Sequence, residues 1–265
     1  MVAGAGYVGQ RVLAACGSPD AFALGRSSGL DLDSDAVLPR PLPASYRILY
    51  TVPPSPALNE DVRLARLLGL LAPLPERFVY ISTTGVYGDC GGGLVDERAT
   101  LRPASDRARR RVAAETQLRD WAAKHAVPYY ILRTPAIYGP GRLGLERLRK
   151  GQPQVAAADA YPGNRIHVAD LLRCCLAALC GAAPPGIYNV GDGDHRSPTW
   201  FAREVARQAG LAAPPEIPRQ TPGESRRVMT QRMRELLGVI PQYTDAADGI
   251  RASLAEKQPE EQPGL

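Results

Sequence analysis

The sequence predicts an α/β protein with a doubly wound, mostly parallel sheet and a small C-terminal lobe. Apolar segments of strand length alternate along the chain with segments in which leucine and alanine recur at helical spacing. Strands separated by helices of about 10–20 residues indicate βαβ units, and right-handed crossovers then give a doubly wound sheet. A G-x-G-x-x-G turn at residues 4–9 follows the first apolar segment, as is typical of this fold class.

Strand signals and helix signals follow one another in order. Strands are expected at 1–3, 21–24, 47–52, 77–82, 129–132 and 186–191. Helices are expected at 10–15, 58–71, 104–125, 168–180, 198–208, 230–237 and 245–255, with Ser105 and Ser197 as caps. The interval from Arg26 to Arg47 is too short for a full helix and strand, so we expect an abbreviated second crossover and one strand reduced or lost.

The chain has the length of one large domain, and we expect residues 1–253 to form it. After about residue 140 the regular alternation ends. The segments at about 139–165 and 191–253 are therefore expected to build most of a lobe that faces substrate. Residues 254–265 are rich in Glu, Gln and Pro and are expected to form a disordered tail.

Composition excludes several function classes. The 265 residues carry a net charge of +5, and no apolar run approaches the ~20 residues of a membrane helix. No signal-peptide pattern opens the chain, so we expect a cytoplasmic protein without membrane contact. Basic residues are dispersed and no nucleic-acid-binding motif is present, which argues against a nucleic-acid partner. The five cysteines lack metal-ligand spacing, so no metal site is expected. Whether the protein forms a homodimer stays open.

The glycine turn carries the first chemical signal. In the mechanism behind its spacing, Gly4 permits a tight turn, Gly6 lets the backbone approach a pyrophosphate, and Gly9 lets a helix pack closely on the sheet. The phosphates would lie at the positive end of the first helix. The alternative is a plain strand-to-helix turn without a ligand.

The end of the second strand indicates which dinucleotide would bind. Sites that prefer NAD usually have a carboxylate here for the ribose 2′-hydroxyl, whereas Arg26 and Ser27 follow the strand and no carboxylate comes before Asp31. A guanidinium and a hydroxyl suit a 2′-phosphate, so the sequence predicts NADP, with NAD less favoured. The alternative is a solvated arginine in a turn.

Several motifs in the same order resemble the extended and atypical short-chain dehydrogenase/reductases, the group that holds the NAD-dependent epimerase/dehydratases. The motifs are GAGYVG at 4–9, YTVPP at 50–54, YISTTGVYG at 80–88, DE at 96–97, LRTPAIYGPGR at 132–142, NRIHVAD at 164–170 and IYNV at 187–190. The resemblance covers roughly residues 1 to 240 and implies a Rossmann fold. It implies a nicotinamide cofactor and a small-molecule substrate.

The resemblance also implies roles for single residues. Thr83 would hydrogen-bond the reacting oxygen, and Tyr138, His167, Tyr87 and Arg142 would point toward substrate. Cofactor contacts are implied along the whole series of motifs: Gly4, Gly6, Tyr7, Val8 and Gly9 at the pyrophosphate, Asp31 and Leu32 at the adenine, Thr51, Val52 and Pro53 at the nicotinamide ribose, and Pro135 to Ile137 at the carboxamide.

One departure from the family pattern bears on function. The family uses a Tyr-x-x-x-Lys pair on its long helix, and Arg107 and Arg111 stand at the matching positions; no such pair occurs anywhere in the chain. Arginine stays protonated near pH 7 and cannot donate the substrate proton, although Arg111 could hold the cofactor ribose or a phosphate. Tyr138 and His167 are then the candidate acids, and the alternative for each is a structural role.

Two functions are consistent with these features. The first is an NADPH-dependent oxidoreductase or epimerase/dehydratase-like enzyme that acts on a carbonyl or alcohol, with a nucleotide sugar as a substrate suggested by the resemblance. The second is a non-catalytic NADP-binding sensor or scaffold protein, suggested by the missing Tyr and Lys.

Overall fold

The computed structural model describes all residues except 35–36, 57–59, 221–222 and 257–265. Its centre is a six-stranded sheet in the order β10-β6-β4-β3-β1-β2, and every strand pair in it is parallel. The strands are β1 (Val2–Ala3), β2 (Ala23–Leu24), β3 (Arg47–Tyr50), β4 (Arg77–Thr83), β6 (Tyr129–Thr134) and β10 (Gly186–Asn189). The predicted doubly wound fold is confirmed.

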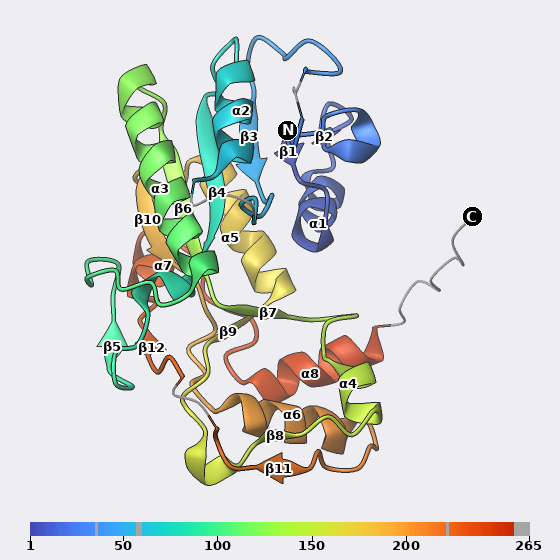
Figure 1. Cartoon of the computed structure of the whole chain (residues 1–265). Helices are drawn as coiled ribbons and strands as arrows, with labels where there is room; N and C mark the ends of the chain where they lie inside the picture. Colours follow the sequence, from blue (N-terminus) through green and yellow to red (C-terminus); the bar gives the residue numbers. More distant parts are fainter. Residues whose placement is uncertain (35–36, 57–59, 221–222, 257–265) are drawn as a thin grey trace.

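Helices cover both faces of the sheet (Figure 1). The helices α1 (Tyr7–Cys16) and α5 (Val168–Cys180) pack on one face, and α2 (Val62–Leu70) and α3 (Asp106–His125) pack on the other. Consecutive strand residues alternate between the two cores: Leu49 packs with α1 and α5, whereas Ile48 and Tyr50 pack with α2 and α3. Because successive residues face opposite cores, Ile48, Leu49 and Tyr50 are all buried, as is typical of a parallel strand covered on both faces.

The second crossover is short, as the sequence predicts. Between β2 and β3 the described residues form a single 3-10 turn, η1 (Arg26–Ser28), and neither an α-helix nor a strand. β2 is therefore the edge strand beside β1, and the chain returns to place β3 on the other side of β1. This reversal creates a switch point at the carboxyl ends of β1 and β3, where ligands bind in folds of this type.

The observed bounds differ from the predicted ones chiefly at element ends. The strands β1 and β2 contain two residues each. The helix α1 begins at Tyr7, and α2 begins after Asp61, whose carboxylate caps the N–H of Leu64; the expected helix residues 58–59 lie outside the described part. α7 (Gln231–Glu235) is shorter than the predicted segment 230–237.

A smaller lobe lies beyond one end of the sheet (Figure 1). Its core contains Tyr138, Leu148, Val205 and Ile250. The lobe is built from α4 (Leu145–Arg149), α6 (Pro198–Gln208) and α8 (Ala246–Ala255) and the pairs β7 (Ala136–Tyr138) with β9 (Arg165–His167) and β8 (Gln154–Val155) with β11 (Glu216–Ile217). A further pair, β5 (Leu94–Val95) with β12 (Arg227–Val228), flanks the sheet.

The C-terminal region was expected to be a disordered tail from residue 254. Leu254 and Ala255 instead form the last residues of α8, and residues from 257 onward lie outside the described part. No helix within the described residues is long and apolar enough to cross a membrane.

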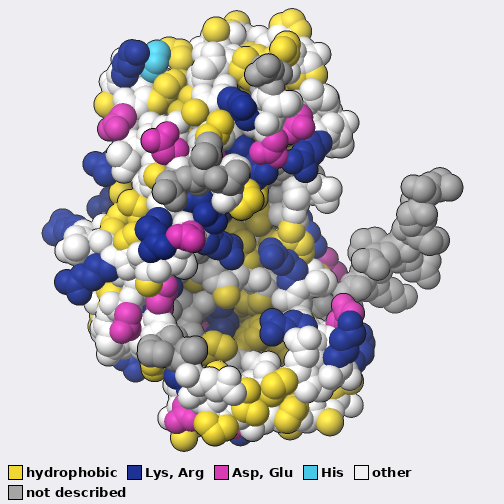
Figure 2. Space-filling view, viewed as in Figure 1, with side chains coloured by type: hydrophobic (Ala, Val, Ile, Leu, Met, Phe, Trp, Pro, Cys, Tyr) yellow, Lys and Arg dark blue, Asp and Glu magenta, His cyan; other side chains and the backbone are white. Residues whose placement is uncertain are grey.

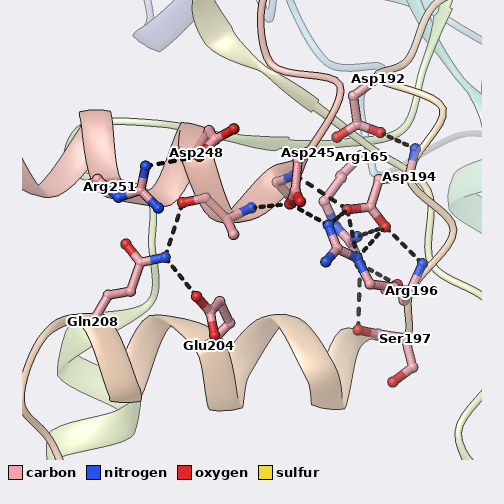
Figure 3. A network of polar contacts seen from close by, with 12 residues as sticks. Arg165, Asp192, Asp194, Arg196, Ser197, Glu204, Gln208, Asp245, Asp248 and Arg251 are labelled. Carbon is pink, nitrogen blue, oxygen red and sulfur yellow. Dashed lines mark hydrogen bonds and ion pairs between the residues drawn. The ribbon is translucent and has the colours of Figure 1, made fainter.

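A polar network centred on the buried Asp194 joins the lobe helices to β9 (Figure 3). The Asp194 carboxylate forms an ion pair with the Arg165 guanidinium at 3.1 Å. It also accepts hydrogen bonds from the backbone N–H of Arg196 at 2.9 Å and of Ala246 at 3.2 Å. The Arg196 side chain also binds Asp194, and it continues to Asp245, which caps α8. The Asp194 carboxylate thus fixes the segment that begins at Arg196 and the start of α8 to β9.

Candidate functional site

The glycine turn has the geometry of a phosphate cradle. Gly4 has φ +93°, and a Cβ there would lie 2.7 Å from Thr51 Oγ1. A Cβ on Gly9 would collide with the carbonyl oxygen of Gly4, so α1 can pack this closely only with glycine. A Cβ on Gly6 would meet no atom within 4 Å, and no side chain caps α1. The start of α1 is therefore open to a ligand, with free N–H groups and the positive helix end directed at it.

A cavity of about 360 Å³ adjoins this turn. It lies at the switch point between β1 and β3, where the fold predicts a ligand. The structure brings seven predicted cofactor residues to its wall: Gly4, Arg26, Ser27, Asp31, Leu32, Val52 and Pro53. The segments that follow β1, β2 and β3 therefore meet at one site, as the sequence predicts.

The charged groups of this cavity are arginines and aspartates in contact. Arg26 pairs with Asp31 at 3.4 Å and with Asp33 at 2.5 Å. Arg63, on the first turn of α2, binds Asp33 with Nε at 2.6 Å and Nη2 at 2.7 Å. Arg63 and Asp33 were not predicted as site residues, because their positions depend on how α2 and the loop after β2 pack.

The other cofactor positions at this end are held by protein contacts. The Thr51 hydroxyl donates to the Gly4 carbonyl at 2.5 Å and so fastens β3 to the turn. Val8 is buried in the core between α1 and α5, so only its backbone faces the open turn. Pro135 and Ile137 are half-buried after β6, where Ile137 packs against the same core.

Tyr7 connects the glycine turn with the lobe. Its hydroxyl donates to the Pro140 carbonyl at 3.0 Å. The guanidinium carbons of Arg11 and Arg142 lie 3.9 and 4.7 Å from the ring centre. Burial raises the pKa of Tyr7. The predicted cofactor residue Tyr7 and the predicted substrate residue Arg142 are thus in direct contact.

A second cavity, of about 650 Å³, lies on the lobe side next to Arg142. It is lined by Gly141, the neighbour of Arg142, and by residues of α4 and the end of α8. Figure 2 shows the surface hollowed between the sheet and the lobe, with Lys or Arg side chains at the rim. Arg142 itself is exposed.

Two predicted residues lie at the start of α3 and the end of β4. Thr83 ends β4, is half-buried and accepts a hydrogen bond from the Gly85 N–H at 3.2 Å. Arg111 is buried; its Nη1 donates to the Tyr80 hydroxyl at 2.9 Å and to the Ile81 carbonyl at 2.8 Å. Arg107, one turn earlier, is exposed. The structure therefore directs the Arg111 guanidinium at β4 and leaves Arg107 at the surface.

The comparisons with known proteins agree with this architecture. Residues 62–191 match the model of the NAD dependent epimerase/dehydratase family. Over these residues the chain is similar to that family. The remainder of the chain contributes the glycine turn, the β2 cavity and part of the lobe.

Relatives and solved structures extend the similarity over more of the chain. A dTDP-glucose 4,6-dehydratase of Streptomyces niveus is 26% identical over 186 residues, 66% of this chain and 55% of the relative. The chain thus spans about half the length of this curated relative. A structure of a protein of unknown function from Silicibacter pomeroyi is 28% identical, with a TM-score of 0.74. The similarity covers 96% of this chain and 97% of that chain. RMD from Pseudomonas aeruginosa, complexed with NADPH, shares the fold at 19% identity, with a TM-score of 0.75. The similarity covers 96% of this chain and 95% of that chain.

The tyrosine of the TTGVYG segment at 83–88 is enclosed. Tyr87, predicted to bind substrate, is fully buried, donates to Asn189 Oδ1 at 2.6 Å and accepts from Arg133 at 3.0 Å. Burial raises the pKa of Tyr87 to about 12. Arg133 in turn binds Glu115 of α3 at 2.7 Å. In this geometry Tyr87 ties the ends of β4, β6 and β10 together.

The two candidate acids lie inside the lobe junction. The Tyr138 ring packs against His167 and Phe201, each centre at 5.2 Å, and its hydroxyl abuts Gly249 of α8. His167 accepts from the Ala169 N–H at 3.2 Å through Nδ1, and its Nε2 lies 3.1 Å from Ser253 Oγ. Burial raises the pKa of Tyr138 and lowers the pKa of His167. Packing and helix capping account for both geometries, and an acid role for either gains no support.

A buried carboxyl near Tyr138 gives a pH-dependent prediction. Asp192 accepts from the Asp194 N–H through Oδ1, and its Oδ2 has no hydrogen-bond partner among the described residues. Burial raises the pKa of Asp192 to about 8. The folded protein therefore keeps this proton up to about pH 8, whereas the unfolded chain releases it near pH 3.9, so stability is lost as pH rises through this window.

We expect Asp192→Asn to remove this loss. The variant should match the wild-type protein at pH 4 and exceed its free energy of unfolding by on the order of 5 kcal/mol at pH 8, measured by urea unfolding. Asp248→Asn, an exposed change on α8, serves as the control that shifts neither value. A stability difference between Asp192→Asn and wild type that is the same at both pH values would contradict the assignment.

Proposed function

We propose that this protein binds NADP at the switch point between β1 and β3. The observation that carries the proposal is the single cavity that unites the glycine turn with Arg26, Ser27 and Arg63. The open start of α1 suits the pyrophosphate. Two guanidiniums and a hydroxyl suit a phosphate on the adenosine ribose, since arginine binds phosphate with paired N–H donors.

The residues near the two cavities support a reaction at a carbonyl or alcohol. Bound NADPH supplies hydride chemistry. Thr83 would orient the reacting oxygen from the end of β4, and exposed Arg142 would grip a substrate phosphate beside the second cavity. The family and the similarity to a dTDP-glucose 4,6-dehydratase favour a nucleotide-sugar-like substrate. Arg111 holds β4 and cannot donate the proton.

A specific observation favours a second candidate, a non-catalytic NADP-binding sensor or scaffold. By the resemblance, Arg107 and Arg111 take the positions of the family's Tyr and Lys. Tyr87, Tyr138 and His167 are all engaged within the protein. Cofactor binding does not need Tyr87, Tyr138 or His167, whereas proton transfer to substrate needs an accessible acid.

A screen of NADPH oxidation over carbonyl compounds, including nucleotide-linked ketosugars, separates the two candidates. An enzyme should turn over, and Thr83→Val should lower kcat about tenfold or more by removing the orienting hydroxyl. Tyr138→Phe and His167→Gln test whether either residue donates the substrate proton. An unchanged kcat in both variants would show that neither does. Tight NADPH binding without turnover of any substrate would favour the sensor, and absence of dinucleotide binding would refute both candidates.

A further inference from the structure

We propose that Asp33 limits the preference for NADP by occupying, with its own carboxylate, the anion position between Arg26 and Arg63. The inference rests on the proposed NADP site and adds to it an internal competitor of the ribose 2′-phosphate. The sequence gives no sign of it, because Asp33 lies nine residues beyond β2 and reaches the cavity only through the fold of its loop.

The contacts of Asp33 are those that a phosphate would make. Arg63 binds both carboxylate oxygens, Oδ1 through Nε at 2.6 Å and Oδ2 through Nη2 at 2.7 Å. Arg26 reaches the same Oδ2 through Nη2 at 2.5 Å. Forked, two-donor binding of this kind serves carboxylates and phosphates equally well. The guanidinium of Arg63 lowers the pKa of Asp33, so the carboxylate is charged at neutral pH.

The two arginines differ in exposure, which would let an exchange occur. Arg63 is fixed: its Nη1 donates to the Pro53 carbonyl at 3.0 Å, and its side chain is 16% exposed. Arg26 is 72% exposed and Asp33 is 32% exposed, so both can move outward without opening the core. A 2′-phosphate could therefore replace Asp33 on Arg63 while Arg26 closes over it.

The charge balance gives the direction of the effect. With Asp31 and Asp33 ionised, the four groups of the cluster sum to zero, and a phosphate dianion that enters meets an adjacent negative charge unless Asp33 leaves. NAD carries a hydroxyl at this position, which can donate to a carboxylate. Asp33 thus weakens NADP binding and does not weaken NAD binding.

Calorimetric titration of the full chain tests this inference. The probes are NADP, NAD, adenosine 2′,5′-bisphosphate and ADP, each with wild type, Asp33→Asn and Asp33→Ala. We expect both variants to bind NADP and the 2′,5′-bisphosphate about tenfold more tightly, with NAD and ADP unchanged or weaker. Arg63→Ala added to Asp33→Asn should abolish the gain.

The control is Asp248→Asn, which removes the same charge from an exposed Asp–Arg pair on α8 and should leave all four affinities unchanged. An equal shift for NADP and NAD, or weaker NADP binding by the Asp33 variants, would overturn the competitor role while leaving the dinucleotide site intact. Binding of neither dinucleotide by wild type or variants would refute the NADP site and the inference together.

Discussion

Gly6→Val is expected to lower the affinity for both NAD and NADP about a hundredfold or more without changing the stability of the protein. A Cβ at Gly6 would meet no protein atom within 4 Å, so we expect the fold to accept a side chain there. The same side chain would fill the open space at the start of α1, where the pyrophosphate must approach the N–H groups. The measurements are dinucleotide titration and thermal unfolding of the same samples.

Gly69→Val is the matched control for this change. Gly69 lies on the exposed side of α2, and a Cβ there also meets no atom within 4 Å. Gly69→Val should bind both dinucleotides as the wild-type protein does. Full affinity in Gly6→Val would place the ligand elsewhere and contradict the glycine cradle.

Asp194→Ala is expected to lower the free energy of unfolding by about 3–5 kcal/mol, because it leaves the buried Arg165 guanidinium without a counter-charge. The side chains of Asp194 and Arg165 are only 4% and 5% exposed and lie 3.1 Å apart. The change also removes the acceptor for the N–H groups of Arg196 and Ala246 at the starts of two segments (Figure 3). Urea unfolding measures the loss.

Two variants show whether the loss comes from this network. Asp194→Asn keeps an oxygen acceptor and should lose less than Asp194→Ala. Asp248→Ala breaks an exposed ion pair with Arg251 on α8 and should change stability little. A loss below about 1 kcal/mol in Asp194→Ala would contradict the view that this carboxylate holds the lobe to β9.

The regular elements were predictable because their signals are local. Ser105 and Ser197 cap α3 and α6, and the bounds of α6 and α5 agree with the apolar periodicity of the sequence. The lobe strands β8 and β11 were not predicted. They are two residues long and pair across some sixty positions, so neither periodicity nor turn chemistry marks them.

The residues of the candidate site also fall into those that local sequence signals predict and those that only the packing reveals. The glycine turn and Arg26 could be identified because each belongs to one strand end, and the fold brings both to one cavity. Arg63 and Asp33 escaped prediction, since only the packing of α2 beside the loop after β2 places them there. The family resemblance predicted that Tyr138 and His167 point toward substrate. Helix α8, which lies far away in sequence, encloses them through Gly249 and Ser253.

The most direct test of the NADP site is the titration of the unaltered protein with NADP and with NAD under identical conditions. The arrangement of the glycine turn, Arg26, Ser27 and Arg63 around one cavity predicts saturable binding of both, with a lower Kd for NADP. Tighter binding of NAD, or no binding of either, would contradict it.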